Sequence, residues 1–415
     1  MKIRLFFLWA MVFSHSVCAE LGLDQKLSLA IEVNNLSPKD CSKIQYGNID
    51  EKRVEVGGLL FETLMLSGNK DTACRTCHLD EFGSADGIPL AVGVGGVGAG
   101  NERYLHGKGI LVQRNAISMV GRGLSDFKNY FWDGKLDASN ENEVVSQFGA
   151  WLSPKFDAPL SVASILPLIE RDEFIGKENI IYENDFQDSV GHKLYQQRYY
   201  ALSKVIRKRI VNDSDAKEIK VALKDIGVDV DRLELADIGN LLGRFIATEF
   251  KCSSSKWDEY LAGDTNALTE SQKSGALLFY GKGRCSICHS GPLQSDFKFH
   301  SIGVPQGSFG PHSRHRDLGR AAVTLKQDDL FKFRTPPLVE VGKTLPYGHN
   351  GAFGTLEDIV VHHINPINYF LNKSNLIVND LNYGKILDSR DKSLSSISIS
   401  SKSEIKSVVE FLEAL

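Results

Sequence analysis

The stretches CRTCH, residues 74–78, and CSICH, residues 285–289, decide the fold of this chain. Each has the pattern Cys-x-x-Cys-His, which presents two thiols and an imidazole within one short turn. The pattern is typical of covalent attachment of c-type haem, because the thiols bond to the two haem vinyl groups and the histidine ligates the iron. A zinc half-site or a redox-active cysteine pair would leave the adjacent histidine unexplained. We therefore predict two haem c groups, attached at Cys74, Cys77 and His78 and at Cys285, Cys288 and His289.

Similar sequence precedes the two motifs. Residues 57–73, GGLLFETLMLSGNKDTA, and residues 274–284, SGALLFYGKGR, both have a helical apolar stripe followed by a glycine-containing loop. This internal repeat predicts a mainly α protein with two cytochrome c-like domains, residues 20–262 and residues 263–415.

Two helices are expected to begin and end the second domain. Thr269 and Gln272 have the spacing of a capping box, which places a helix start at Thr269. The last helix is predicted within residues 403–415, where one apolar stripe is formed by Ile405, Val408, Val409 and Leu412.

The first 19 residues have the composition of a cleaved export signal. Lys2 and Arg4 precede an apolar run, residues 5–13, and small residues end the segment before Glu20. The run is too short to span a bilayer, and no later segment is long and apolar enough to do so. We therefore expect a periplasmic protein without a membrane span, with residues 1–19 as the signal peptide.

The remaining composition is that of an ordinary globular chain. Of its 415 residues, 42% are hydrophobic and 24% are charged, and the net charge is −4. This balance gives no electrostatic basis for binding nucleic acid. Outside the two motifs and the signal peptide, Cys41 and Cys252 remain. They could form a disulfide in an oxidising compartment, but the sequence does not show whether they meet.

The sixth ligand of each iron decides whether a haem only carries electrons or also reacts with peroxide. No methionine follows Cys285, so the second haem takes none from its own domain. The other candidates are His300, His312, His315, His349, His362 and His363, with tyrosine as a weaker option. In TLEDIVVHH, residues 355–363, His363 lies on the helical apolar stripe, whereas His362 is turned about 100° away. We predict that His363 is the ligand and that His362 faces solvent.

The first haem has no comparable ligand close by in the sequence. Residues 79–105 contain neither histidine nor methionine, and the glycine-rich stretch 91–100 lacks phosphate-loop spacing, so it predicts a flexible loop. His106 is the nearest candidate ligand, with a surface loop position as its alternative role. We expect the first haem to be five-coordinate, with His78 alone, which leaves one position for peroxide.

With these motifs and flanks, the chain resembles the bacterial di-haem cytochrome c peroxidase family, and more closely its MauG-like branch. The likeness covers most of the mature chain, and its specific parts are RNA (114–116), FWDGK (131–135), FRTPPL (333–338), LPYGHNG (345–351) and TLEDIVVHH (355–363). The resemblance implies that Trp132 lies between the two haems. It also implies that the distal ligand of the second haem is the residue fourteen positions after His349, which is again His363.

The resemblance also implies one calcium ion between the haems. By motif, its ligands would be the side chain of Asn115 and the backbone carbonyls of Thr344 and Pro346. Oxygen-only ligation suits calcium. Without the resemblance, Asn115 would be interpreted as an ordinary turn residue.

A glutamate near the open haem moves a proton during peroxide cleavage in this family. It follows a proline by six residues, which fits Glu173 after Pro167 in SILPLIERDEFIG, residues 164–176. The glutamine that usually stands four residues before that proline is Ala163 here. The alternatives for the proton-transfer residue are Glu170 and Asp157.

These features predict an exported di-haem peroxidase that reduces hydrogen peroxide. Its reductant is either a small redox protein or an aromatic residue of a partner protein, oxidised as MauG does. Val94 stands where some peroxidases of the family carry a switch histidine, and together with His363 it favours the protein substrate. The alternative is a di-haem electron-transfer cytochrome without peroxide chemistry, in which His106 or another residue closes the first haem.

Overall fold

The computed structural model describes residues 21–106, 109, 111–140, 143–146, 155–176, 184–190, 193–306, 317–367 and 383–415. The expected signal peptide, residues 1–19, lies outside the described residues, as do His312 and His315. The protein is mainly α, as predicted. Its helices are α2 (Leu23–Val33), α3 (Glu51–Glu62), α4 (Pro159–Ile165), α5 (Asp185–Val190), α6 (Tyr195–Asn212), α7 (Lys217–Asp225), α8 (Leu235–Glu249), α9 (Lys256–Leu261), α10 (Glu270–Tyr280), α11 (Ala321–Thr324), α12 (Leu356–Ile364), α14 (Tyr383–Asp388) and α15 (Lys402–Leu412).

The strands are short and pair only in small antiparallel sheets within the described residues. One sheet has the order β3-β4-β5, and two further pairs are β1-β2 and β6-β7. Their bounds are β1 (Gly96–Val97), β2 (Tyr104–Leu105), β3 (Asn129–Tyr130), β4 (Leu136–Asn140), β5 (Glu143–Ser146), β6 (Phe299–His300) and β7 (Phe333–Arg334). The turn between β3 and β4 carries Trp132, and β7 carries Arg334, so these sheets position two residues of the candidate site.

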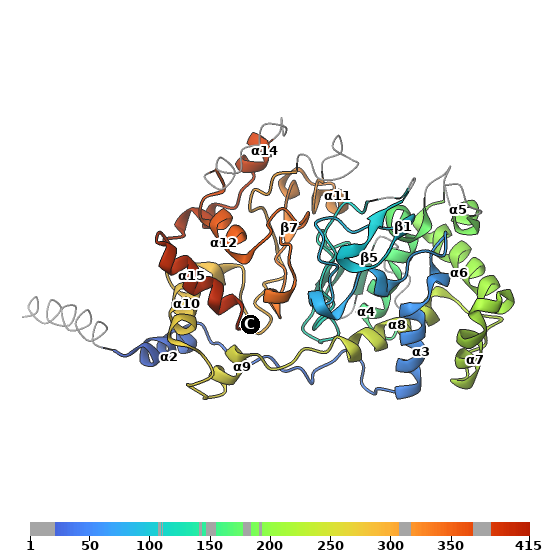
Figure 1. Cartoon of the computed structure of the whole chain (residues 1–415), viewed down its shortest axis with the longest axis horizontal. Coiled ribbons are helices and arrows are strands. Elements are labelled where there is room, and N and C mark those ends of the chain that lie inside the picture. Colours follow the sequence, from blue (N-terminus) through green and yellow to red (C-terminus); the bar gives the residue numbers. More distant parts are fainter. Residues whose placement is uncertain are drawn as a thin grey trace, which may run out of the picture.

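Two hydrophobic clusters form the core. Figure 1 shows α3 to α8 gathered at one end of the molecule, and α10, α12 and α15 at the other. Helix α2 lies beside α10, and its Leu27 is buried in the second cluster together with Trp257 and Tyr260 of α9. The clusters therefore do not follow the predicted boundary between residues 262 and 263, because parts of the predicted first domain complete the second core. An internal sequence repeat marks equivalent local segments, but it does not show that α2 and α9 pack into the second core.

The internal repeat is visible in the way helices pack. A Cβ atom on Gly57 of α3 would clash with the backbone of Leu241 in α8, and one on Gly275 of α10 would clash with the backbone of Ser407 in α15. Glycine therefore lets each helix pair approach closely, at equivalent positions of the two repeats. A Cys-x-x-Cys-His turn follows α3 and α10 in turn, so both turns are anchored by the same kind of packed helix pair.

The two proximal histidines also have equivalent neighbours. The ring of Phe61 lies 6.3 Å from the ring of His78, and the ring of Phe279 lies 6.4 Å from that of His289, centroid to centroid. The interplanar angles are 44° and 51°. The repeated sequence thus produces a repeated local geometry around both histidines.

Helix ends in the second half agree with the sequence. Thr269 caps α10: its hydroxyl accepts the backbone N–H of Gln272 at 3.2 Å, and the Gln272 side chain accepts the N–H of Thr269 at 2.9 Å. The predicted capping box is therefore confirmed. Helix α15 begins after Ser401 and buries Val408 and Leu412, which confirms the amphipathic stripe expected there.

Two segments of the chain connect the ends of the molecule, one after α2 and one after α8 (Figure 1). Cys41 and Cys252 join them through a disulfide with Cα atoms 5.6 Å apart, so the two cysteines do meet. Lys39 and Asp258 form an ion pair between the same segments, and the backbone N–H of Lys39 donates to that carboxylate at 2.9 Å. Among the described helices, none is both long and apolar enough to cross a membrane.

Candidate haem sites and active site

The first Cys-x-x-Cys-His turn opens into a cavity of about 1100 Å³. Cys74, Cys77 and His78 all line it. The Nδ1 of His78 donates to the carbonyl oxygen of Ser84 at 2.7 Å, which leaves Nε2 as the unprotonated nitrogen. Burial lowers the pKa of His78 to about 4, so the imidazole is neutral at ordinary pH. A neutral, oriented imidazole is what a proximal iron ligand requires.

Glu173 lines the same cavity from a single π-helical turn, Arg171–Ile175. Burial raises the pKa of its carboxyl to about 7, against the opposing attraction of Lys135. A carboxyl group with this pKa exists in both protonation states near neutrality, and single π-turns are frequent at functional sites. Glu173 is therefore suited to accept and return a proton.

The two alternatives to Glu173 differ in position. Glu170 also lines the cavity, but its carboxylate pairs with Lys135 at 2.9 Å. Asp157 pairs with Arg244 at 2.8 Å near the surface and is not among the residues that line the cavity. Glu170 and Glu173 therefore line the same cavity as His78, whereas Asp157 does not.

Residues considered as a sixth ligand of the first haem do not reach this cavity. His106 is exposed and does not line the cavity. Val94, which stands at the position of the switch histidine, is fully buried and does not line the cavity either. Met119 does line it, and sequence reasoning missed this residue because it lies beyond residues 79–105, the stretch that directly follows His78. The backbone N–H of Met119 donates to the hydroxyl of Ser84, the residue whose carbonyl holds His78, at 2.7 Å.

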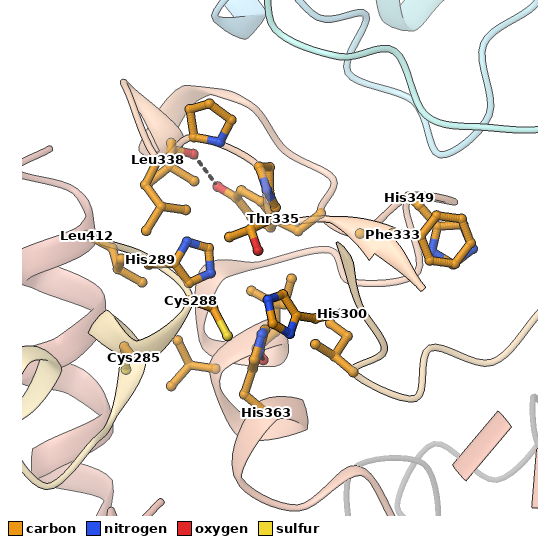
Figure 2. A pocket seen from close by; sticks show the side chains of 18 of the residues that line it. Cys285, Cys288, His289, His300, Phe333, Thr335, Leu338, His349, His363 and Leu412 are labelled. Atoms are coloured by element: carbon orange, nitrogen blue, oxygen red, sulfur yellow. Dashed lines mark hydrogen bonds between the residues drawn. The ribbon is translucent and has the colours of Figure 1, made fainter. Parts of the chain in front are cut away.

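The second turn opens into a narrower, mostly apolar cavity of about 230 Å³. Figure 2 shows Cys285, Cys288 and His289 at its wall. The Nδ1 of His289 donates to the carbonyl of Gln294 at 3.0 Å, and burial lowers the pKa of the imidazole to about 4. His289 therefore has the same neutral, backbone-held form as His78.

His363 enters this second cavity from α12 (Figure 2). Its Nδ1 donates to the carbonyl of Ile359 at 2.7 Å, which leaves Nε2 for a ligand. His300 also borders the cavity, but its two nitrogens are bonded to the carboxylates of Asp296 and Asp391, at 3.0 Å and 2.6 Å. Asp296, the neighbouring Cys288 thiol and Asp391 raise the pKa of His300 to about 11, and both ring nitrogens are already engaged with carboxylates.

The remaining histidines of the second half point elsewhere. His349 stacks on Phe333, with ring centroids 3.6 Å apart, and Figure 2 shows this pair away from His289. His362 was expected to face solvent, and that prediction is wrong. It is fully buried, its Nε2 bonds to the carbonyl of Ile302 at 2.9 Å, and its ring packs on Phe353. The loop around Ile302 covers the side of α12 that the helical pattern left polar.

Trp132 lies in the wall that the two cavities share. Its indole N–H donates to the backbone carbonyl of Asn115 at 3.1 Å, and its own carbonyl accepts the N–H of Arg334 at 2.8 Å. Next to it, Asp133 pairs with the partly buried Arg114 at 2.6 Å. These bonds fix the indole, which is buried, between the sites of His78 and His289.

The three expected calcium ligands meet at the second cavity. Asn115, Thr344 and Pro346 all line it, although their sequence positions are far apart. The Asn115 amide donates to the carbonyls of Ile88 and Pro89, at 2.9 Å and 3.3 Å, so its Oδ1 is the atom left for a cation. This donor set contains oxygen only, which fits calcium.

Both cavities fit a haem c group by the chemistry of their donors. Each has two thiols on one short turn and one neutral imidazole with Nε2 available, and the second cavity also has mostly apolar walls. The four thiols are not in disulfides, and they are partly buried in the cavity walls. The residues that would hold the haems are therefore those predicted from the two motifs.

Comparison with known proteins agrees with this arrangement. Residues 51–266 match the family model of di-haem cytochrome c peroxidases. The chain is 37% identical to the cytochrome c551 peroxidase of Nitrosomonas europaea over 307 residues, which covers 74% of this chain and 71% of the relative. It is 23% identical over 371 residues to the methylamine utilization protein MauG of Methylorubrum extorquens, covering 86% and 84% of the two chains.

Solved structures give the same fold. The crystal structure of the di-haem peroxidase BthA from Burkholderia thailandensis superposes with a TM-score of 0.64 at 18% identity, over 92% of this chain and 89% of that one. The chain belongs to the di-haem cytochrome c peroxidase family and is an oxidoreductase. Membership implies two haem c groups, in agreement with the two cavities.

Proposed function

We propose that this chain is an exported, periplasmic peroxidase that reduces hydrogen peroxide in the cavity of His78. When bound there, the haem supplies an iron atom at which peroxide is reduced. The observation that carries the proposal is Glu173, a carboxyl group of pKa about 7 in the same cavity as His78. A cavity built only for electron transfer has no need of such a group.

Glu173 acts as the proton-transfer group in this proposal. As a carboxylate it accepts the proton of incoming peroxide, and as a carboxylic acid it returns a proton to the departing oxygen. Lys135 limits the rise in the pKa of Glu173, and its ammonium group forms an ion pair with Glu170. We therefore assign the proton transfer to Glu173 rather than to Glu170.

His289 and His363 hold the second haem as a bis-imidazole pair, and Trp132 couples the two sites. Two imidazole nitrogens stabilise an oxidised iron better than a thioether does, because methionine ligation raises the reduction potential. The second site is then suited to hold an oxidising equivalent. The buried indole of Trp132 in the shared wall gives electrons an aromatic route between the cavities.

The electrons come from a redox protein or from an aromatic residue of a partner protein. The likeness to MauG and to cytochrome c peroxidases supports both possibilities. The histidine at position 363 and the valine at position 94 favour the partner protein, since neither matches a peroxidase that is activated by loss of a ligand on reduction. A calcium ion held by Asn115, Thr344 and Pro346 would stabilise the position of these residues in the cavity wall.

A second candidate function is electron transfer without peroxide chemistry, and Met119 favours it. This methionine lines the cavity of His78 and would close the first haem if its sulfur reached the iron. The test is the spectrum of the haem-loaded protein, combined with peroxide turnover against reduced cytochrome c. A high-spin ferric signal that reacts with peroxide supports the peroxidase. Purely low-spin haem that ignores peroxide, and becomes high-spin in Met119→Leu, supports the alternative.

A further inference from the structure

Two buried arginines lie at the partition, which is the wall that the two cavities share, and neither has a carboxylate partner among the described residues. Arg122 is 5% exposed and lines both cavities, and Arg334 is 1% exposed and lines the second. Within the described residues, neither guanidinium forms an ion pair. A buried charge without a counter-charge is costly, so an anionic group is expected there.

The hydrogen bonds of these arginines are incomplete. Arg334 donates from Nε to the carbonyl of Phe131 at 2.9 Å and from Nη1 to that of Thr335 at 3.3 Å, but its buried Nη2 has no partner. Arg122 donates from Nε to the carbonyl of Ser118 at 2.6 Å. Both guanidinium groups lie over the ring of Phe127, at 5.4 Å and 5.5 Å, so they are close enough to repel each other.

By comparison, three other poorly exposed arginines among the described residues have partners. Arg114 pairs with Asp133 and Asp317, and Arg209 pairs with Asp185. Arg103 has no ion pair, but it donates to a ring of backbone carbonyls and to a threonine hydroxyl. Burial lowers the pKa of Arg334 to about 9 and that of Arg122 to about 10, which reflects the missing counter-charge.

Asp133 acts electrostatically on Arg334, but its carboxylate oxygens already have other partners. One oxygen of Asp133 lies 2.6 Å from Arg114, and the other accepts the backbone N–H of Lys135 at 3.0 Å. Tyr130 is the other polar group facing both arginines, and its hydroxyl donates to the carbonyl of Arg122 at 3.3 Å. The part of the chain that the structure describes therefore supplies no anion for this pair.

We propose that Arg334 and Arg122 bind the propionate carboxylates of the haems. A haem carries its propionates on the edge away from the vinyl groups that the cysteines hold, and a guanidinium binds a carboxylate through two parallel hydrogen bonds. Arg334 takes a propionate of the second haem. Arg122 lines both cavities and binds a haem propionate at the partition. This inference rests on haem attachment and does not depend on peroxide chemistry.

The arrangement fixes how the second haem is turned in its cavity. In this arrangement its thioether edge would lie at Cys285 and Cys288, and its propionate edge would face the partition that contains Trp132. Arg334 belongs to the stretch FRTPPL, residues 333–338, and its backbone N–H also holds the carbonyl of Trp132. In this proposal Arg334 binds the propionate edge of the second haem through its side chain and Trp132 through its backbone N–H.

The test uses the haem-loaded protein and needs no peroxide. Arg334→Leu, Arg334→Lys and Arg122→Leu are compared with Arg232→Leu, which removes an exposed charge elsewhere. Reduction potentials are titrated optically, and propionate vibrations are followed by resonance Raman. Loss of a cation beside a propionate stabilises ferric iron, so Arg334→Leu should lower the potential of the second haem only, and Arg122→Leu should lower both. Arg334→Lys keeps the charge and should fall between Arg334→Leu and wild type.

Two results would overturn the proposal. One is an Arg334→Leu protein, with complete haem attachment by mass, whose potentials and propionate bands equal those of Arg232→Leu. The other needs no variant: a crystal structure of the wild-type holoprotein in which the Arg334 and Arg122 nitrogens contact no propionate oxygen. The second result decides the matter even if the leucine variants do not fold.

Discussion

Trp132 donates its indole N–H to the backbone carbonyl of Asn115 at 3.1 Å, and both residues line both cavities. This one bond links the residue proposed to conduct electrons with the residue proposed to bind calcium. Because the backbone N–H of Asn115 also donates to the carbonyl of His349 at 2.8 Å, the segments 114–116, 131–135 and 345–351 meet at a single point. Three of the stretches that carry the family resemblance therefore build one wall.

Replacing Trp132 by phenylalanine should slow electron transfer between the haems. The smaller ring loses the bond to Asn115 and leaves a wider gap for electrons to cross between the cavities, with a stability loss of about 1 kcal/mol. Stopped-flow spectroscopy of the two haems after peroxide addition measures the rate. Trp257→Phe, in the second core away from both cavities, is the matched control, and equal rates in both variants would contradict the proposed route.

Removing calcium should weaken the wall between the cavities. Treatment with a chelator is expected to lower peroxide turnover and to shift the spectrum of the haems, and added Ca²⁺ should restore both better than Mg²⁺, which demands a tighter octahedral site. In Asn115→Ala the chelator should have no further effect. Elemental analysis that finds no calcium in the purified protein would exclude this role for Asn115.

Glu173→Gln should lower peroxide turnover by roughly 10²- to 10⁴-fold, the range that general acid–base catalysis contributes. Haem content and the ferric spectrum should stay the same, since glutamine keeps the size of the side chain. Glu170→Gln is the informative comparison because its carboxylate shares the cavity. A larger loss in Glu170→Gln than in Glu173→Gln would assign the proton transfer to Glu170.

The pH dependence of turnover should follow the raised pKa of Glu173. Proton acceptance needs the carboxylate, so activity should rise as pH increases through about 7 and fall below it. Lys135 lowers this pKa, whereas Glu170 and Asp172 raise it. Lys135→Met should therefore move the rising limb to higher pH. A profile that is unchanged in Glu173→Gln would mean that another group titrates.

His363→Met should change the low-spin spectrum of the second haem and raise its potential, as methionine ligation does. His362→Ala should leave the spectrum unchanged but cost about 1–3 kcal/mol of stability, because the carbonyl of Ile302 loses its partner in a buried site. Denaturant unfolding measures the second effect. If His362→Ala changes the spectrum and His363→Met does not, the ligand assignment is reversed.

Local features of the fold were accessible from the sequence, whereas long-range contacts were not. The capping box at Thr269 and the stripe of α15 depend on residues within one or two turns, and both were predicted correctly. His362 was misplaced because a helical pattern describes one helix and not the loop at Ile302 that covers it. Leu27 joined the second core for the same reason, since its partners come from the far end of the chain.

The candidate site shows the same limit. The two Cys-x-x-Cys-His motifs predicted both haem turns from their own chemistry, and the family resemblance added Glu173 and Trp132 to the site. Met119 and Arg334 gave no such signal. Their significance comes from what surrounds them: a shared cavity in one case, and a missing counter-charge in the other.

The disulfide between Cys41 and Cys252 sets a problem of assembly order. The described residues include six cysteines, of which two are oxidised to a disulfide and four remain as thiols. Cys41 and Cys252 lose electrons to each other, whereas the four motif thiols must stay reduced until they add to vinyl groups. The disulfide loop also encloses residues 74–78 but not residues 285–289. In the oxidising compartment proposed for this chain, maturation has to protect the four motif thiols while Cys41 and Cys252 are joined, and errors in this sorting are a route to misassembly.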